Sequence, residues 1–327
     1  MLERIIELLT QSNILHGSEK LRPITTGQSC AYVYSVDDKY IIKYYSHLQE
    51  HDFITRMMCQ KEYDFYKICS RKNIDFIPKV VFQIANDDEI LILMKKYSPI
   101  KNEEWTENLQ KRAVELYAKI NALDTADFNE LFLKYEKLKA ELNKIVGYKP
   151  DGTPIFKDEY PLSLSYQNWK NIQEKFPKHI EVSLLNEMYG NFDKRVSPIP
   201  ETLCHGDWNP NSCLKDGDKL LICDWAEVGI GKGIDSVTWF IKSGERMGID
   251  INRDKLIEEY CKALFKYANI KIDLNDLHKH FAASDFGVTF TFGAEYLQNA
   301  DIDSVLNAYN TMANNYKLMM KYSRAHL

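Results

Sequence analysis

The chain has 327 residues, of which 45% are hydrophobic, so it can form one large domain or two lobes around a substantial core. Its formal net charge of -5 argues against a general binder of nucleic acid or membrane surfaces, because such proteins are usually basic. No apolar run approaches the roughly 18 residues of a membrane span. The seven cysteines include no C-x-x-C pair, and we interpret them as free thiols of a cytoplasmic protein.

The first 97 residues predict a small antiparallel sheet with one inserted helix. The N-terminal segment MLERIIELL predicts an amphipathic helix over 2–13 and not a signal peptide. The segments AYVYSV and YIIKYY, joined by the turn DDK, predict a hairpin within residues 21–45. An apolar periodicity predicts a helix over 49–71, and KVVFQIA and EILILMKKY predict a second hairpin.

From residue 98 onward the pattern becomes mostly helical. We expect helices at 105–123, 126–146, 165–176 and 180–190. The segment GYKPDGTPIF predicts a loop or a short hairpin, because its prolines exclude a central strand. The segment DGDKLLICDW predicts a turn and an apolar strand, and 235–323 predicts further helices. The chain therefore divides into a lobe of residues 1–97 and a lobe of residues 98–327.

Two carboxylates late in the chain point to phosphoryl transfer. Asp207 follows the short sequence CHG, and Asp224 ends the strand LLIC 17 positions later. Because the residues between them fit a hairpin, we expect Asp224 to return beside Asp207. Phosphoryl transfer needs a positioned nucleophile and neutralised charge, so Asp207 could accept the proton of a substrate hydroxyl. Asp224 could hold Mg²⁺, which prefers carboxylate and phosphate oxygens.

The first lobe supplies a matching pair of charges. Lys43 lies on the predicted strand YIIKYY, and Glu62 lies 19 residues later on the following helix. A lysine that contacts phosphates must be held in one orientation, and a glutamate on a neighbouring helix can hold it.

These segments together resemble the aminoglycoside phosphotransferase and choline kinase family, relatives of the protein kinases. The resemblance is specific over 203–240, which contains HGD and CDWAEVGIG, and looser over 27–66, which contains IIK and the helix glutamate. It implies an α+β, two-lobed protein-kinase-like fold, with a small antiparallel-sheet N-lobe carrying one helix and a larger, mainly helical C-lobe. It also implies that ATP, or GTP, binds between the lobes.

The resemblance implies a role for each of these residues. Asp207 matches the catalytic base, and His205 matches the histidine that braces its loop. Asp224 matches the metal-binding aspartate, and Asp235 matches an aspartate that caps the catalytic loop from below. It assigns Lys43 and Glu62 to the binding of the nucleotide. It also assigns Gly27 and Ser29 in the phosphate loop, and Met94 and Lys96 at the end of EILILMKKY, to the nucleotide.

The chain departs from the family pattern at Ser212. The pattern has asparagine there, five positions after the base, as the second metal ligand. Three interpretations stay open. The Ser212 hydroxyl binds Mg²⁺ directly or through water; the loop shifts by one position and Asn211 is the ligand; or the metal site is weakened in a chain that binds nucleotide and hardly reacts.

Two other patterns predict no site. The segment SDFGV at 284–288 contains Asp-Phe-Gly, but it lies in a predicted helix with no apolar strand before it. His278 and His280 form an H-x-H pair, and side chains two positions apart diverge on a helix, so we expect no metal there.

The acceptor is expected to be a small molecule. Only eleven positions separate Asp224 from Asp235, which leaves no room for a segment that docks a protein substrate. The leading hypothesis is an ATP-dependent kinase for a hydroxyl of a small cationic molecule, such as an aminoglycoside antibiotic. The alternatives are a metabolic kinase for choline, another amino alcohol or a sugar, and a nucleotide-binding pseudokinase. We expect a monomer or weak dimer without nucleic-acid or membrane partners. Acids that could face the acceptor are Glu227, Glu245, Asp285 and Glu295.

Overall fold

The N-terminal part of the chain forms a five-stranded antiparallel sheet. The computed structural model describes residues 2–12, 14, 20–24, 31–46, 53–142, 147–148, 154–155, 162–192 and 199–323. The strands lie in the order β1-β2-β3-β5-β4. They are β1 (Leu21–Pro23), β2 (Tyr32–Val36), β3 (Tyr40–Ser46), β4 (Val80–Ala85) and β5 (Glu89–Lys95).

Each face of this sheet has its own covering helix. Helix α1 (Leu2–Gln11) packs with Ile42 and Tyr44 of β3 in one buried cluster. Because side chains alternate along a strand, Lys43 points to the opposite face, on the side of α2 (Phe53–Arg71). On that face Tyr45 joins a larger core that continues into the helical part of the chain. The alternation of YIIKYY therefore directs Lys43 toward the following helix.

The second part of the chain surrounds two small sheets with helices. Strands β11-β10-β6 form one sheet, and β12-β9 form another. These strands are β6 (Ser98–Pro99), β9 (Glu201–Cys204), β10 (Cys213–Asp216), β11 (Lys219–Ile222) and β12 (Gly229–Lys232). Strand β7 (Gly147–Tyr148) pairs antiparallel with β8 (Pro154–Ile155), which agrees with the second of the two forms expected for GYKPDGTPIF.

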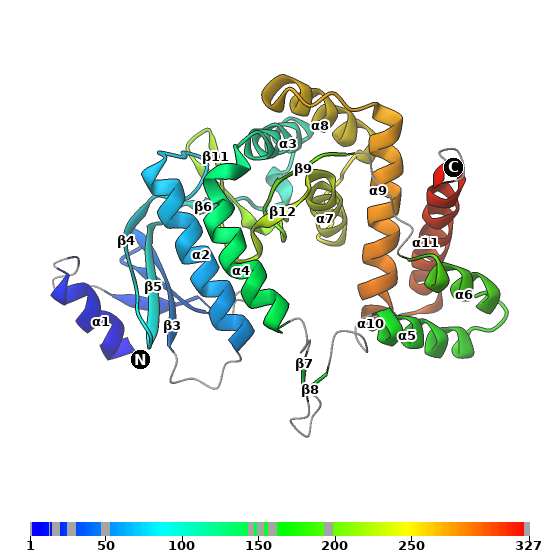
Figure 1. Cartoon of the computed structure of the whole chain (residues 1–327), viewed down its shortest axis with the longest axis horizontal. Helices are drawn as coiled ribbons and strands as arrows, with labels where there is room; N and C mark the ends of the chain where they lie inside the picture. The colour runs from blue at the N-terminus through cyan, green and yellow to red at the C-terminus, as the bar shows by residue number, and fades with distance from the viewer. Residues whose placement is uncertain are drawn as a thin grey trace.

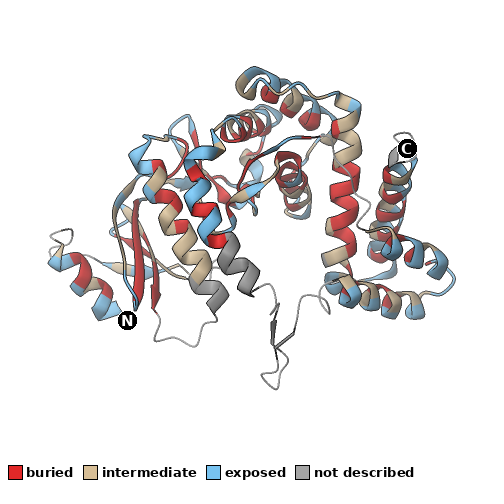
Figure 2. Ribbon diagram, viewed as in Figure 1, coloured by how far each residue is buried: buried red, intermediate tan, exposed pale blue. Residues whose placement is uncertain are grey.

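Helices make up most of this second part (Figure 1). Their bounds are α3 (Glu107–Asn121), α4 (Asn129–Leu142), α5 (Leu162–Lys175), α6 (Val182–Gly190), α7 (Gly233–Arg246), α8 (Arg253–Ala268), α9 (Leu274–Val288), α10 (Ala294–Leu297) and α11 (Ile302–Ser323). Helix α4 lies along α2, and a π-helical turn, Thr289–Gly293, joins α9 to α10. Figure 2 shows buried residues along both β5 and α9.

The predicted fold class is confirmed. An antiparallel sheet with one inserted helix precedes a mostly helical second part, which is the two-lobed kinase-like arrangement. The Asp-Phe-Gly segment lies inside α9, as expected. The boundary between residues 97 and 98 stays a prediction. The six cysteines in the described part of the chain are free thiols, and no helix there is long and apolar enough to cross a membrane.

Candidate active site

The catalytic loop begins where β9 ends. Gly206 has a φ of +88°, and a Cβ at this position would lie only 2.4 Å from the Glu227 carbonyl oxygen. Glycine therefore lets the loop turn sharply against the segment that follows Asp224. This turn places Asp207 directly after the strand, half-buried and close to both Asp224 and Glu227.

Asp207 has the properties of a general base. Burial raises the pKa of its carboxyl group, and the negative charges of Asp224 and Glu227 raise it further. The indole N–H of Trp239 donates a hydrogen bond to Asp207 Oδ1 at 2.5 Å, which favours the charged form and fixes the carboxylate. A carboxylate with a raised pKa, held in one orientation, is suited to accept a proton from a hydroxyl.

Lys43, Glu62 and Asp224 meet in one ion cluster, although they come from β3, α2 and the end of β11. Lys43 Nζ lies 2.9 Å from Glu62 Oε1 and 2.6 Å from Asp224 Oδ1. Burial opposes the charge of Lys43, but the two carboxylates raise its pKa well above the ordinary value. Lys43 in turn lowers the pKa of Asp224. The lysine is therefore charged and held where two lobes of the fold meet.

The backbone around Asp224 is locked into an unusual conformation. Asp224 has a φ of 70° and a ψ of 57°, a left-handed geometry that is uncommon for a residue with a side chain. The next residue, Trp225, is fully buried; its backbone N–H donates to Glu62 Oε1 at 3.1 Å. Its ring stacks on Phe65 of α2 at 4.5 Å. The glutamate that holds Lys43 therefore also fixes the residue after Asp224.

His205 connects the catalytic loop to the same segment. Its Nε2–H donates to the Cys223 carbonyl oxygen at 2.8 Å, and its backbone N–H donates to the Tyr117 hydroxyl at 3.2 Å. The ring is fully buried, which lowers the pKa of His205 to about 4, so it is neutral at physiological pH. The predicted bracing role fits this geometry, because a neutral, buried ring joins the loops of Asp207 and Asp224.

The hydroxyl of Ser212 is directed into its own loop. Ser212 Oγ donates to the Asn209 carbonyl at 2.7 Å and accepts from the Asn209 N–H at 3.1 Å, and the residue is 4% exposed. The Asn209 amide donates in turn to the Asp207 carbonyl at 3.0 Å. The Asn211 residue is exposed. The choice between Ser212 and Asn211 as metal ligand stays a prediction; the Ser212 oxygen, which donates once and accepts once, has one lone pair left for that role.

The residues around Asp224 fit a magnesium ion that arrives with a nucleotide. The Asp224 side chain is half exposed, at 50%, and the exposed acid Glu227 follows three positions later. Mg²⁺ is usually held by one or two carboxylates, with phosphates and water completing its six ligands. Within the described ranges no three His, Cys, Asp or Glu side chains form a preformed metal cage. Asp224 would therefore hold an ion whose other ligands come from the phosphates.

The remaining predicted residues are only partly placed. Gly27 and Ser29 lie outside the described residues. Met94 is buried on β5, and Lys96 Nζ lies 2.8 Å from Asp38 Oδ1 in the turn between β2 and β3. Asp235 lies in the first turn of α7, where its Oδ1 is 3.1 Å from His280 Nε2 on α9. The roles of Met94, Lys96 and Asp235 stay predictions.

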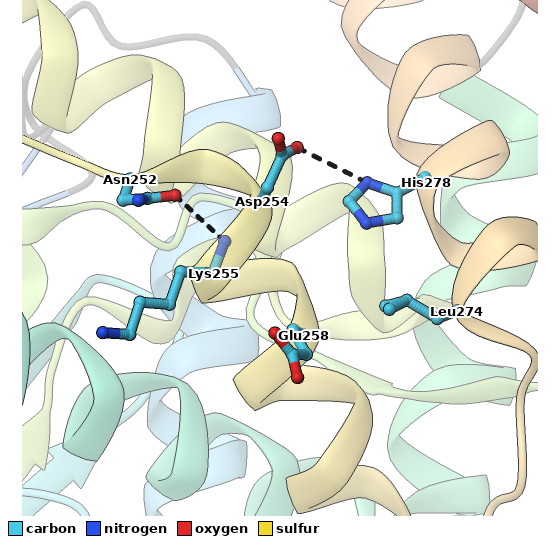
Figure 3. Close-up of a pocket in the computed structure, with 6 residues that line it drawn as sticks. All are labelled: Asn252, Asp254, Lys255, Glu258, Leu274 and His278. Carbon is cyan, nitrogen blue, oxygen red and sulfur yellow. Dashed lines mark hydrogen bonds and ion pairs between the residues drawn. The ribbon is translucent and has the colours of Figure 1, made fainter.

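A cavity of about 610 Å³ opens elsewhere, between α8 and α9. Figure 3 shows the polar side chains around it, with Asp254 and His278 facing each other across the two helices. None of the residues that line the cavity belongs to the ion cluster or to the catalytic loop. This cavity is therefore separate from Asp207 and Asp224.

The structure resembles solved kinases, although no family model and no curated protein matches the sequence. A choline kinase from Cryptosporidium parvum is 12% identical with a TM-score of 0.55, over 100% of this chain and 97% of that one. A microcompartment-associated aminopropanol kinase is 12% identical with a TM-score of 0.55, over 98% of each chain. The streptomycin–ATP–APH(2″)-IIa complex is 12% identical with a TM-score of 0.54, over 97% of each chain. The chain has the kinase-like fold of these proteins.

Within this kinase-like fold, two features of the site were not predicted from the sequence. No contact between Trp239 and the predicted base was expected, yet the Trp239 N–H donates directly to Asp207. Two of the acids expected near the acceptor are neutralised instead: Asp285 is buried and paired with Lys242, and Glu245 is paired with Arg253. The position of Trp239, one helical turn after Asp235, was the only signal available in the sequence.

Proposed function

We propose that this chain is an ATP-dependent phosphotransferase whose acceptor is a hydroxyl group of a small molecule. The observation that carries the proposal is the half-buried Asp207, with its raised pKa, beside the cluster of Lys43, Glu62 and Asp224. This arrangement supplies a base for the hydroxyl and a fixed positive charge for the phosphates, which are the main requirements of phosphoryl transfer.

The proposed step moves one proton and one phosphoryl group. Asp207 accepts the hydroxyl proton while the acceptor oxygen forms a bond to the γ-phosphorus, and the bond to the bridging oxygen of ADP breaks. Lys43 contacts the phosphates, while Glu62 keeps it in place. Mg²⁺, when bound at Asp224, neutralises charge on the phosphates. Some structural neighbours were solved with ATP, ADP or AMP, which supports ATP over GTP.

The acceptor class is proposed to be a small molecule with an amino group. The neighbours include kinases of choline, ethanolamine and aminopropanol, and complexes with streptomycin and gentamicin. An aminoglycoside would imply a role in antibiotic resistance, whereas an amino alcohol or a sugar would imply a metabolic role. The exposed carboxylate of Glu227, next to the catalytic loop, is the described acid best placed to meet an amino group.

The test compares wild type with Asp207→Asn. Purified protein with ATP and Mg²⁺ is screened against aminoglycosides, amino alcohols and sugars, and ADP release is measured. We expect turnover of at least one acceptor class by wild type and a loss of about a hundredfold or more in the variant, the scale of lost base catalysis. Nucleotide binding, measured by thermal shift, should be nearly unchanged.

Two outcomes would count against the proposal. Near-wild-type turnover by Asp207→Asn would show that another group is the base. Nucleotide binding that ignores Mg²⁺, with no turnover of any acceptor, would favour the pseudokinase.

A further inference from the structure

Arg246, at the end of α7, lies over two aromatic rings, one of which contacts the proposed base. Its Cζ is 5.3 Å from the centre of the Trp239 ring and 5.7 Å from the centre of the Tyr296 ring. The same Trp239 donates its N–H to Asp207 Oδ1 at 2.5 Å. A single indole therefore contacts the carboxylate at one side and supports the guanidinium at another.

The neighbouring cations are already paired, whereas Arg246 has no carboxylate partner among the described residues. Lys242, one turn earlier on α7, contacts the buried Asp285 and donates to Thr289 Oγ1 at 2.8 Å. Arg253 is bound by both carboxylate oxygens of Glu245. In the described part of the chain no carboxylate lies within ion-pair distance of Arg246, and this residue is exposed. Its positive charge is therefore available to a ligand.

Stacking on rings prepares an arginine for anion binding. A guanidinium that lies on aromatic rings keeps its planar fork of N–H donors at the edge, where it matches the two oxygens of a carboxylate. The rings also restrict the side chain, so less conformational freedom is lost when a ligand binds. A cationic group of the acceptor would be repelled from this position, because the guanidinium already lies over both rings and carries a positive charge.

We propose that Arg246 binds a carboxylate of the acceptor, so that the acceptor is a small hydroxy amino acid. This inference rests on the proposed phosphotransferase function and narrows its acceptor class. The hydroxyl faces Asp207, the carboxylate faces Arg246, and the amino group is met by Glu227. Unlike the amino alcohols and aminoglycosides named for the structural neighbours, such an acceptor carries a carboxylate.

The test uses acceptor pairs that differ only in the carboxylate. Serine is compared with ethanolamine, and threonine with 1-amino-2-propanol, using the full chain with ATP and Mg²⁺ and measuring kcat/KM by ADP release. For wild type we expect the carboxylated member of a pair to be preferred by about tenfold to a hundredfold, the scale of a charge-assisted hydrogen bond.

Three variants locate the effect. Arg246→Gln should abolish the preference by lowering kcat/KM for the carboxylated member, while the amino alcohol changes less than about twofold. Arg246→Lys should restore only part of the preference, because an ammonium lacks the planar fork. Lys266→Gln is the matched control: Lys266 also lies over a tyrosine ring, that of Tyr267, but on α8 and outside the site, so it should change nothing.

The outcomes separate this inference from the proposed function. Equal turnover within each pair overturns the inference and leaves the proposed phosphotransferase function intact. The same holds if the best acceptor has no carboxylate, as in choline, streptomycin or glucose, and its turnover is unaffected by Arg246→Gln. The absence of any turnover although nucleotide binds overturns both. A preference for the carboxylated member that survives in Arg246→Gln shows that another residue binds the carboxylate, and also overturns the inference.

Discussion

Replacement of Trp239 by phenylalanine should show how far the proposed base depends on one hydrogen bond. The indole N–H donates to Asp207 Oδ1 at 2.5 Å, so the change removes the donor and keeps an aromatic ring under Arg246. A hydrogen bond to a charged group contributes about 1.5–3 kcal/mol. If the bond orients the carboxylate during proton transfer, kcat should fall by about tenfold to a hundredfold.

The pH dependence gives this prediction a sign. The N–H stabilises the charged carboxylate and so lowers the pKa of Asp207, while burial, Asp224 and Glu227 raise it. Without the N–H the pKa rises further, so the acid limb of the kcat/KM profile should move to higher pH. Asp207 must lose its proton before it can act as a base. In the variant, activity should therefore appear at a higher pH than in wild type.

The assay is ADP release between pH 5 and 9, with nucleotide affinity and melting temperature measured as controls. Nucleotide affinity should be unchanged, because the described contacts of Trp239 are with Asp207 and Arg246 and not with the cluster around Lys43. An unchanged acid limb together with unchanged kcat would refute the reasoning. A fall in kcat without a shifted limb would retain the positioning role of Trp239 and reject its electrostatic role.

Two further predictions concern the ion cluster and the metal. Lys43→Ala should weaken turnover strongly and Glu62→Ala more mildly, and their double-mutant cycle should show a coupling of about 0.5–3 kcal/mol, because the two side chains touch at 2.9 Å; strict additivity would contradict a shared role. In an Mg²⁺ titration at fixed ATP, Ser212→Ala should raise the Mg²⁺ requirement and Asn211→Ala should do less. The reverse order would assign the metal to Asn211.

Much of the fold followed from the sequence because its signals are local. The segment YIIKYY predicted the strand that carries Lys43, and the helix of Glu62 followed from apolar periodicity. Strands β9 and β12 were not predicted. Each has four residues, and they stabilise each other by a pairing of Cys204 with Gly229 across the catalytic loop, which no local pattern reveals.

The site was harder to predict where one side chain serves two partners. Sequence spacing suggested that Lys43 and Glu62 would meet, and they do. It did not suggest that Lys43 would contact Asp224 as well, or that Glu62 would accept the backbone N–H of Trp225. Such contacts depend on how the two parts of the chain pack, and Phe65 stacked on Trp225 sets that packing.

Ser212 also has contacts in the folded loop that its position in the sequence did not predict. By its position it replaces an asparagine of the family pattern, which suggested a weaker metal ligand. In the folded loop its hydroxyl bonds both backbone groups of Asn209, and the Asn209 side chain bonds the carbonyl of Asp207. Each of these bonds fixes a backbone group near the base. The serine therefore helps to hold the loop of the proposed base, and we expect Asp224 and the phosphates to bind most of the Mg²⁺.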